Sequence, residues 1–253
     1  MNVSALAVRS QDFLNFLDTW QAGLPGLALA DALAEPTRAA IIAVDVIEGF
    51  CTTGPLASPR VGAMVDPIVG LFEAAWEHGL RNILLIQDTH EPDAVEFEAW
   101  PAHCVRGTAE AEPVAAIKAL PFYADLQQMP KNSISAGLNT GLEAWLSAHP
   151  QVDTLIVTGD CTDLCTYQLS MHLRLTANAR QLARRVIVPA DCVETYDRSV
   201  ATAVAQGGLP HDADLLHAVF LYHMALNGVE VVKDLTLYPP TPFSQNREKG
   251  EKF

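Results

Sequence analysis

The sequence is poor in basic residues and in cysteine. Only 16 Lys and Arg stand against 30 Asp and Glu among 253 residues, which gives a formal net charge of -14. Non-specific binding to the phosphate backbone of a nucleic acid requires clustered Lys and Arg, so we expect no nucleic-acid partner. Five cysteines are too few, and odd in number, for a disulfide framework in a chain of this length. We therefore expect at least one cysteine thiol to have a chemical role in the function of the protein.

Long apolar runs are also absent. No stretch approaches the roughly 20 apolar residues that cross a bilayer, and the first residues lack a basic region followed by an apolar one. We therefore expect a cytoplasmic protein that does not associate with a membrane. Hydrophobic residues still make up 49% of the chain, which supplies a large core, and the length suits one α/β domain.

Short apolar runs that fit buried strands alternate with helical patterns along the chain. The predicted strands are 39–46, 82–87, 153–158, 185–189 and 229–232. The predicted helices are 66–78, 142–147, 162–182 and 215–227, the first with Asp66 as its N-cap and Gly79 just past its end. This alternation indicates βαβ units and hence an α/β fold: a three-layer, doubly wound, mostly parallel sheet.

The chain divides into three predicted segments. Residues 1–38 form an N-terminal helical arm, residues 39–236 the α/β domain, and residues 237–253 a peripheral C-terminal tail rich in proline and charge. We expect the arm to pack on a neighbouring subunit of a homo-oligomer or to cover an edge of the sheet.

Chemically distinctive residues lie where three predicted strands end. Asp45 interrupts the first apolar run, Asp88 follows the second, and Gly159 opens a turn after the third. Each one alone is equally consistent with an N-cap or turn role. Ligands of open parallel sheets bind outside the carboxyl ends of the strands, so the three together predict one crevice.

Cys165 is expected in the first turn of the helix that follows Gly159. A helix N-terminus carries partial positive charge and unpaired N–H groups, so it lowers a thiol pKa and can hold an oxyanion. The pattern therefore favours Cys165 as a nucleophile. The alternative is that Cys161 and Cys165 are small buried apolar side chains. The remaining cysteines are interpreted as structural thiols: Cys51, Cys104 and Cys192.

The long loop after the second strand carries two histidines near a carboxylate. Asp88, His90 and His103 offer ligands that Zn²⁺, Fe²⁺ or Mn²⁺ accept, with open positions for water or substrate. The alternative is a pair of solvent-exposed loop histidines. Lys131, taken by itself, is more consistent with a solvated surface lysine. The other histidines lack ligand spacing: His78, His149, His172, His211, His217 and His223.

Together these motifs resemble the isochorismatase-like cysteine hydrolase superfamily, and within it the nicotinamidases, the plant-type ones especially. The similar segments are VDVIEGFC at 44–51, DTHEPDAVEFEAWPAHCVRGT at 88–108, the segment around Lys131, and GDCTDLCTYQLSMHL at 159–173. The Asp, Lys and Cys set is shared across the superfamily, whereas the D-x-H and W-P-x-H-C-V-x-G-T pattern marks the nicotinamidase-like branch. The resemblance covers about residues 39–232.

The resemblance implies a role for each residue. Cys165 would be the nucleophile, Asp45 the acid/base that takes and returns its proton, and Lys131 the cation that keeps both poised. Backbone N–H groups of Cys161 and Cys165 would form the oxyanion hole. The peptide bond between Asp160 and Cys161 would be cis.

The resemblance also implies a substrate, nicotinamide, hydrolysed to nicotinate and ammonia through a cysteine thioester. A metal, zinc by preference and Fe²⁺ or Mn²⁺ otherwise, would fix the pyridine ring on Asp88, His90 and His103. Two aromatic side chains, Phe50 and Trp100, match the ring-stacking positions of the family.

Departures from the family pattern leave other substrates open. Thr166 follows the nucleophile in place of the usual valine, and Gly137 and Leu138 replace an aromatic residue. One alternative is therefore an amidohydrolase of the same superfamily acting on another small amide or ureide. A second alternative is a non-catalytic zinc-binding relative that binds ligands without turnover.

Overall fold

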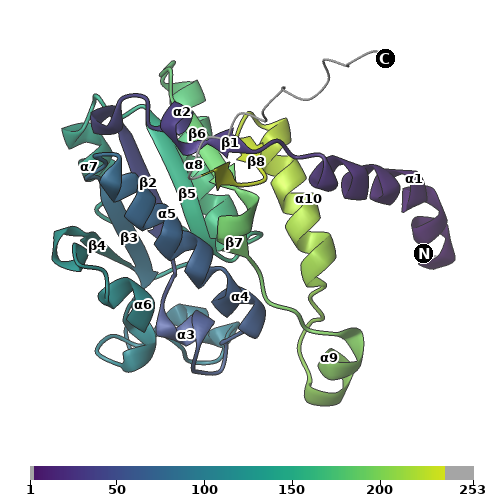
Figure 1. The fold of residues 1–253 in the computed structure, drawn as a ribbon. Coiled ribbons are helices and arrows are strands. Elements are labelled where there is room, and N and C mark those ends of the chain that lie inside the picture. The colour runs from purple at the N-terminus through teal and green to yellow at the C-terminus, as the bar shows by residue number, and fades with distance from the viewer. Residues whose placement is uncertain (1–2, 237–253) are drawn as a thin grey trace, which may run out of the picture.

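Parallel strands form the central sheet of the structure, a computed structural model that describes residues 3–236 (Figure 1). They run in the order β4-β3-β2-β5-β6-β8, and β7 pairs with the end of β5. Their bounds are β2 Ala39–Val44, β3 Ile83–Asp88, β4 Gln127–Lys131, β5 Thr154–Asp160, β6 Arg185–Pro189, β7 Val193–Glu194 and β8 Glu230–Val232. The predicted strands are thus confirmed to within two residues at either end.

One strand that the sequence did not predict, β4, lies at the edge of the sheet. Its residues alternate between partly exposed and exposed up to the buried Lys131, so it lacks the apolar run of the central strands. Its Pro130 has no N–H to donate, which an edge strand tolerates better than a central one. The edge position therefore explains why hydrophobicity gave no sign of this strand.

Helices cover both faces of the sheet. On one face lie α4 Pro59–Ala63, α5 Val65–Glu77 and α6 Ala115–Lys118, and on the other α7 Leu142–Ala148, α8 Cys165–Ala179 and α10 Ala213–Leu226. Further helices are α2 Leu29–Ala32, α3 Glu48–Cys51 and α9 Val200–Gln206. Single 3₁₀ turns lie at Pro36–Arg38, Val95–Glu98, Ala109–Ala111, Tyr123–Asp125 and Ala190–Cys192. The predicted three-layer α/β fold is confirmed.

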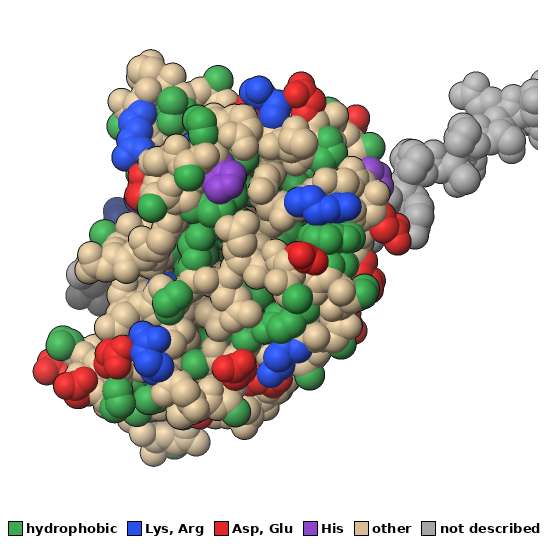
Figure 2. Space-filling view, turned by 90° about the vertical axis from the view of Figure 1, so that its left-hand side faces the viewer, with side chains coloured by type: hydrophobic (Ala, Val, Ile, Leu, Met, Phe, Trp, Pro, Cys, Tyr) green, Lys and Arg blue, Asp and Glu red, His purple; other side chains and the backbone are tan. Residues whose placement is uncertain are grey.

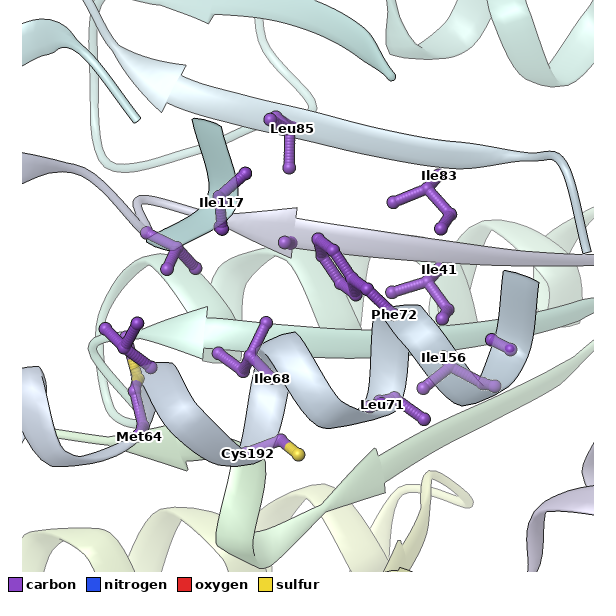
Figure 3. Packing of buried hydrophobic residues seen from close by; sticks show 14 of the residues in the cluster. Ile41, Met64, Ile68, Leu71, Phe72, Ile83, Leu85, Ile117, Ile156 and Cys192 are labelled. Carbon is purple, nitrogen blue, oxygen red and sulfur yellow. The ribbon is translucent and has the colours of Figure 1, made fainter. Parts of the chain in front are cut away.

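Helix α5 packs one face of the core. Ile68, Leu71 and Phe72 recur at helical spacing, so they share one side of α5 and lie over Ile41 and Ile83 of the strands (Figure 3). All are almost fully buried. Burial of such a side chain stabilises the fold by about 1.5–3 kcal/mol. The opposite core is built in the same way by residues of α7, α8 and α10.

The predicted starts of α5 and α8 differ from the structure for identifiable reasons. The expected N-cap Asp66 lies instead in the first turn of α5, because α4 delivers the chain already in helical conformation at Met64, the residue that caps α5. The helix expected from residue 162 begins only at Cys165. The helix begins later than predicted because the Thr162 N–H donates to the Glu194 carbonyl of β7, which holds residue 162 outside the helix.

The N-terminal helix α1, Val3–Ala22, extends from the body and lies against α10 (Figure 1). Phe13, Phe16 and Trp20 surround Tyr222 of α10, with ring centroids 5.3–5.6 Å apart. Beyond α1, β1 Leu27–Ala28 pairs in parallel with β9 Leu235–Thr236, which ties the two ends of the described chain together. Packing of the arm on a neighbouring subunit stays a prediction, as do the segment boundaries.

The tail predicted at 237–253 lies outside the described residues. Within residues 3–236, no helix combines the length and the apolar character that crossing a membrane requires. On the face shown in Figure 2, Lys and Arg side chains are spread out and several lie beside acidic ones.

Candidate active site

Strand register brings the predicted catalytic segments together at the carboxyl ends of the parallel strands. Asp88 of β3 is the direct partner of Lys131 of β4, and Val44, the residue before Asp45, pairs with Gly159 of β5. From β2 the chain winds outward through β3 and β4, and from β5 it winds the other way through β6 and β8. The carboxyl ends of β2 and β5 therefore form the topological switch point, where such sheets bind ligands.

Asp45 lies fully buried at the end of β2 in a left-handed conformation. Its φ is +58°, uncommon for a residue with a side chain. Its N–H donates to the Ile86 carbonyl at 2.9 Å, and its Oδ1 accepts from the Asp88 N–H at 2.8 Å. Burial and the nearby Asp88 raise the pKa of Asp45 to about 6, although Lys131 opposes this rise. The carboxylate is thus held rigidly and is more basic than usual.

Lys131 is buried at the end of the edge strand, where its ammonium has four polar neighbours. Nζ lies 2.8 Å from Asp45 Oδ2, 2.5 Å from Asp88 Oδ1 and 3.6 Å from Cys165 Sγ, and it donates to the Ser133 carbonyl at 3.1 Å. Burial alone would lower the pKa of Lys131, but the two carboxylates raise it well above its ordinary value. The lysine is therefore a buried cation, and its interpretation as a solvated surface residue is wrong.

Cys165 begins α8 and points its thiol at this charge cluster. Its Sγ and carboxylate oxygens of Asp45 and Asp88 all lie within 4.8 Å of one another. Burial raises the pKa of the Cys165 thiol well above its ordinary value, and Lys131 only partly offsets this. The thiol pKa is therefore raised and not lowered as expected, because desolvation and the two carboxylates outweigh the attraction of Lys131. The neighbouring Asp45 and Asp88 carboxylates add to this rise in the thiol pKa.

The turn before Cys165 requires glycine at its first position. Gly159 has φ +117°, and a Cβ there would lie 1.9 Å from the Val44 carbonyl oxygen. The peptide bond between Asp160 and Cys161 is cis, as predicted. The N–H groups of Leu164 and Thr166 both donate to the Cys161 carbonyl at 3.1 Å. These bonds fold residues 161–165 into a tight turn at the foot of α8.

The three predicted metal ligands also meet beside Asp88. His90 Nε2 lies 3.4 Å from Asp88 Oδ1, and His103 Nε2 lies 3.9 Å from Asp88 Oδ2. Both histidines are buried, so their interpretation as solvent-exposed loop residues is wrong. One carboxylate oxygen and two imidazole nitrogens within 4.8 Å of one another are a ligand set suited to zinc.

The other ring nitrogen of each histidine is engaged by an acceptor. His90 Nδ1 lies 2.9 Å from Asn132 Oδ1, and His103 Nδ1 lies 2.8 Å from the Pro101 carbonyl. An Nδ1–H donor leaves a neutral imidazole with a lone pair on Nε2, the arrangement typical of metal-bound histidine. His90 Nε2 is buried and has no hydrogen-bond partner among the described residues. These residues therefore fit a divalent cation.

The pKa values of the ligand residues reflect the same cluster. Burial lowers the pKa of His103. Burial would also lower that of His90, but Asp88 raises it. For Asp88, Lys131 and His90 outweigh the effect of burial and lower the pKa. A proton and a metal ion thus compete for the same imidazole lone pair.

Aromatic side chains lie beside the two histidines and in the loop that joins them. The Phe50 ring lies 5.6 Å from that of His103, and half-buried Trp100 lies edge-on to Tyr196 at 6.4 Å. Sequence reasoning missed Phe97, whose ring lies 5.4 Å from His90 and 5.7 Å from His103. Its place in the loop between the two histidines was the available signal.

Sequence reasoning also missed two histidines beside the Cys161–Cys165 turn. His211 Nε2 lies 2.8 Å from Asp163 Oδ2, and His217 Nδ1 lies 2.8 Å from Thr162 Oγ1. Their separation of about 50 residues along the chain from these partners left no signal. The cysteines interpreted as structural are buried, and burial raises the pKa of each: Cys51, Cys104 and Cys192.

Comparison with known proteins agrees with this geometry. The isochorismatase domain family model matches residues 39–208. Nicotinamidase 1 of Arabidopsis thaliana is 29% identical over 217 residues, 78% of this chain and 86% of the relative. Nicotinamidase of Escherichia coli (strain K12) is 30% identical over 158 residues, 51% of this chain and 73% of the relative. The structure of pyrazinamidase of Pyrococcus horikoshii in complex with zinc superposes with a TM-score of 0.61 at 21% identity, covering 78% of this chain and 99% of that one.

Proposed function

The chain belongs to the isochorismatase domain family, and on that premise we propose that it is a metal-assisted cysteine amidohydrolase that converts nicotinamide to nicotinate and ammonia. The observation that carries the proposal is the buried contact of Lys131 with Asp45 and with the thiol of Cys165. A thiol, a base of raised pKa and a fixed cation are the parts that acyl transfer through cysteine requires.

The first half of the reaction forms a thioester. Asp45 takes the proton from Cys165 as sulfur attacks the amide carbon, and Lys131 stabilises the thiolate across 3.6 Å. Backbone N–H groups of Cys161 and Cys165 would hold the oxyanion at the start of α8, which no side chain caps in the described structure. Asp45 then returns its proton to the leaving nitrogen, which departs as ammonia.

The second half releases the acid. Asp45, again a carboxylate, takes a proton from a water molecule that attacks the thioester carbon. The tetrahedral intermediate uses the same oxyanion donors, and its collapse returns the proton to the Cys165 sulfur. A base with a pKa of about 6 is mostly ionised at neutral pH, so it suits both proton transfers.

Asp88, His90 and His103 would hold the metal ion, with zinc the first choice for one oxygen and two nitrogen donors. Asp45, Asp88 and Lys131 together leave one uncompensated negative charge in the buried site, which favours a divalent cation. When bound, the ion would supply a Lewis-acidic position that orients a ring nitrogen of the substrate.

The side chains around the metal ligands suit a flat ring. Phe50, Phe97 and Trp100 offer apolar walls, and aromatic rings gain from such contacts by about 0.5–1.5 kcal/mol beyond area burial. A heteroaromatic amide with its nitrogen toward the histidines and its carboxamide toward Cys165 satisfies both halves of the site. This is the support for nicotinamide over an aliphatic amide.

A second candidate, another small amide or ureide, follows from the departures near the nucleophile. A Cβ at Gly137 would lie 2.6 Å from His172 Nδ1, so the space beside this position is taken by a polar side chain. Thr166, next to the nucleophile, is fully buried. Neither position belongs to the proposed catalytic set, so the departures concern the choice of amide and not the type of reaction.

Ammonia release from a panel of amides tests the proposal. The panel holds nicotinamide, pyrazinamide, benzamide, N-carbamoyl amino acids and short aliphatic amides, each with metal-loaded protein. We expect the highest kcat/KM for nicotinamide or pyrazinamide and a lower value for benzamide, which lacks the ring nitrogen. Preference for a carbamoyl compound would replace the substrate assignment, and no release from any amide would favour the ligand-binding relative.

A further inference from the structure

The turn that carries the nucleophile is held in place by hydrogen bonds from residues outside the site to the Asp163 carboxylate. This residue lies between the two proposed oxyanion donors, and each of its carboxylate oxygens has a buried partner. Thr195 Oγ1 donates to Oδ1 at 2.6 Å, and His211 Nε2 lies 2.8 Å from Oδ2. The turn is thereby held by side chains that lie outside residues 161–165.

His211 connects Asp163 to the aromatic side chains of Tyr196 and Trp100. Its Nδ1 lies 2.7 Å from the Tyr196 carbonyl, and its ring stacks on the Tyr196 ring at 3.9 Å and 18°. Tyr196 in turn meets the edge of Trp100. A carboxylate and a carbonyl both accept, so each ring nitrogen of His211 faces an acceptor. One ring therefore bridges the catalytic turn and the proposed ring-binding wall.

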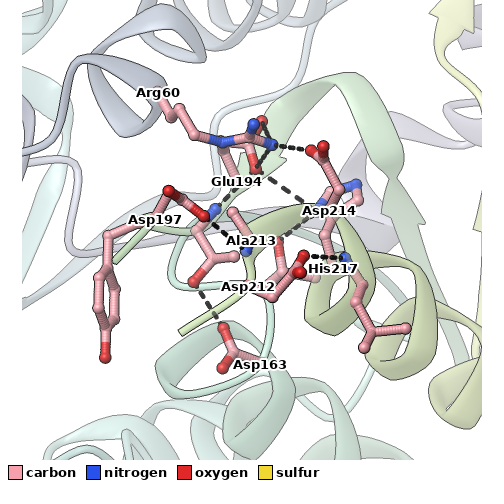
Figure 4. A network of polar contacts seen from close by, with 12 residues as sticks. Arg60, Asp163, Glu194, Asp197, Asp212, Ala213, Asp214 and His217 are labelled. Carbon is pink, nitrogen blue, oxygen red and sulfur yellow. Dashed lines mark hydrogen bonds and ion pairs between the residues drawn. The ribbon is translucent and has the colours of Figure 1, made fainter. Parts of the chain in front are cut away.

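The residues that hold Asp163 are themselves fixed by further hydrogen bonds. His211 and Arg198 exchange two backbone hydrogen bonds of 2.8 Å, which close the base of the α9 segment. Glu194 of β7 accepts from the Thr162 N–H through its carbonyl and from Arg60 through its carboxylate. Figure 4 shows Asp163 joined to this network, with Arg60 and Glu194 at its other end. His211 is thus placed by backbone contacts that do not depend on the site.

We propose that His211 is a positioning residue, which fixes the Cys161–Cys165 turn through Asp163 and the Trp100 wall through Tyr196. Its effect on turnover rests on the amidohydrolase function proposed above. Because oxyanion donors and the thiol act only in precise geometry, a displacement of the turn lowers kcat by about 10-fold to 100-fold.

The test compares His211→Gln with His211→Leu in the full chain. Glutamine keeps a donor toward Asp163, whereas leucine leaves that carboxylate with one partner fewer. We expect kcat for the best amide to fall in the order His, Gln, Leu. His149→Gln is the matched control, because His149 Nδ1 also lies 2.8 Å from an acceptor, the Trp145 carbonyl, but on α7 and away from the turn. It should keep the kcat of the unaltered protein.

A second readout does not need amidase activity. The rate at which iodoacetamide alkylates Cys165, followed by mass spectrometry of its peptide, should fall in the His211 variants as the sulfur shifts relative to Lys131. Asp163→Asn should lower kcat and alkylation, and adding it to His211→Gln should lower them little further. Unchanged kcat and alkylation in folded His211→Gln, or additive losses in the double variant, would overturn the proposal. Absence of amidase activity in the unaltered protein would contradict the function alone, since the alkylation comparison still tests the positioning.

Discussion

Lys131 Nζ lies 2.5 Å from Asp88 Oδ1 while it also lies 2.8 Å from Asp45 Oδ2. One ammonium thus joins the proposed metal ligands to the proposed acid/base. A change at Asp88 would not affect the proposed metal ligands alone, since it also alters the electrostatic field at Asp45 and Cys165. The proposed metal ligands and the proposed nucleophile therefore belong to one electrostatic cluster.

Asp45→Asn removes the proposed base and keeps the backbone, because asparagine tolerates a positive φ. General bases contribute about 10²-fold to 10⁴-fold, so we expect kcat to fall by that range while the metal content is retained. Ammonia release and elemental analysis check the two statements. Asp66→Asn, an exposed position in α5, is the control and should leave kcat unchanged. Full activity of Asp45→Asn would remove this residue from the mechanism.

The two cysteines of the turn should respond differently. Cys165→Ala removes the nucleophile, so we expect no turnover and unchanged metal content. Cys161→Ala keeps the backbone N–H that is its proposed contribution, so most of the activity should remain. Trapping of the thioester by acid quench and mass spectrometry locates the acyl group. An acyl group on Cys161 would reverse the assignment.

His90→Ala and His103→Ala should each lower bound metal from about one ion per chain to a small fraction, because each removes one of three protein ligands. His149→Ala serves as the control, since His149 stacks on Trp145 on the covering helix α7 instead. Inductively coupled plasma mass spectrometry after dialysis gives the stoichiometry. Equal metal in all three variants would exclude the two histidines as ligands.

Trp100→Ala should raise KM for a pyridine carboxamide more than it lowers kcat, because the ring wall contributes to binding. A loss of about 0.5–1.5 kcal/mol corresponds to a 2-fold to 13-fold rise in KM. Steady-state kinetics with nicotinamide and with a short aliphatic amide separate the effects. An equal change for both substrates would argue against ring recognition.

Gly159→Ala should prevent correct folding or lower the melting temperature strongly, because the new Cβ would meet the Val44 carbonyl at 1.9 Å. Gly107→Ala is a matched control, since Gly107 also has a positive φ, +80°, but nothing within 4 Å of the added Cβ. Only the conformational cost of about 1–2 kcal/mol applies there. Thermal unfolding of both variants gives the comparison, and equal shifts would contradict the steric argument.

The sequence predicted five strands of the central sheet, β2, β3, β5, β6 and β8, and its resemblance to a known superfamily supplied the six residues of the proposed triad and metal set. Runs such as that of β2 are buried on both faces, so their hydrophobicity identifies them. Cys165 and Asp88 follow from where predicted strands end. Lys131 gave no such sign, because its burial depends on two carboxylates brought in by neighbouring strands.

Other parts lay beyond local patterns. The strand β4 escaped because edge strands need not be apolar. His211 escaped because its partner Asp163 is distant in sequence, and only the packing of the α9 segment against the turn unites them. The direction of the Cys165 pKa shift was missed because desolvation is a property of the completed fold.

The place of Lys131 on β4 has a consequence for how the site fails. Edge strands open locally more readily than central ones, as hydrogen exchange measures. Each opening of β4 would carry the ammonium away from Asp45 and leave two carboxylates unopposed in the interior. On heating, activity should therefore be lost while the central strands are still protected from hydrogen exchange. Inactivation would then measure local opening of β4, which precedes global unfolding.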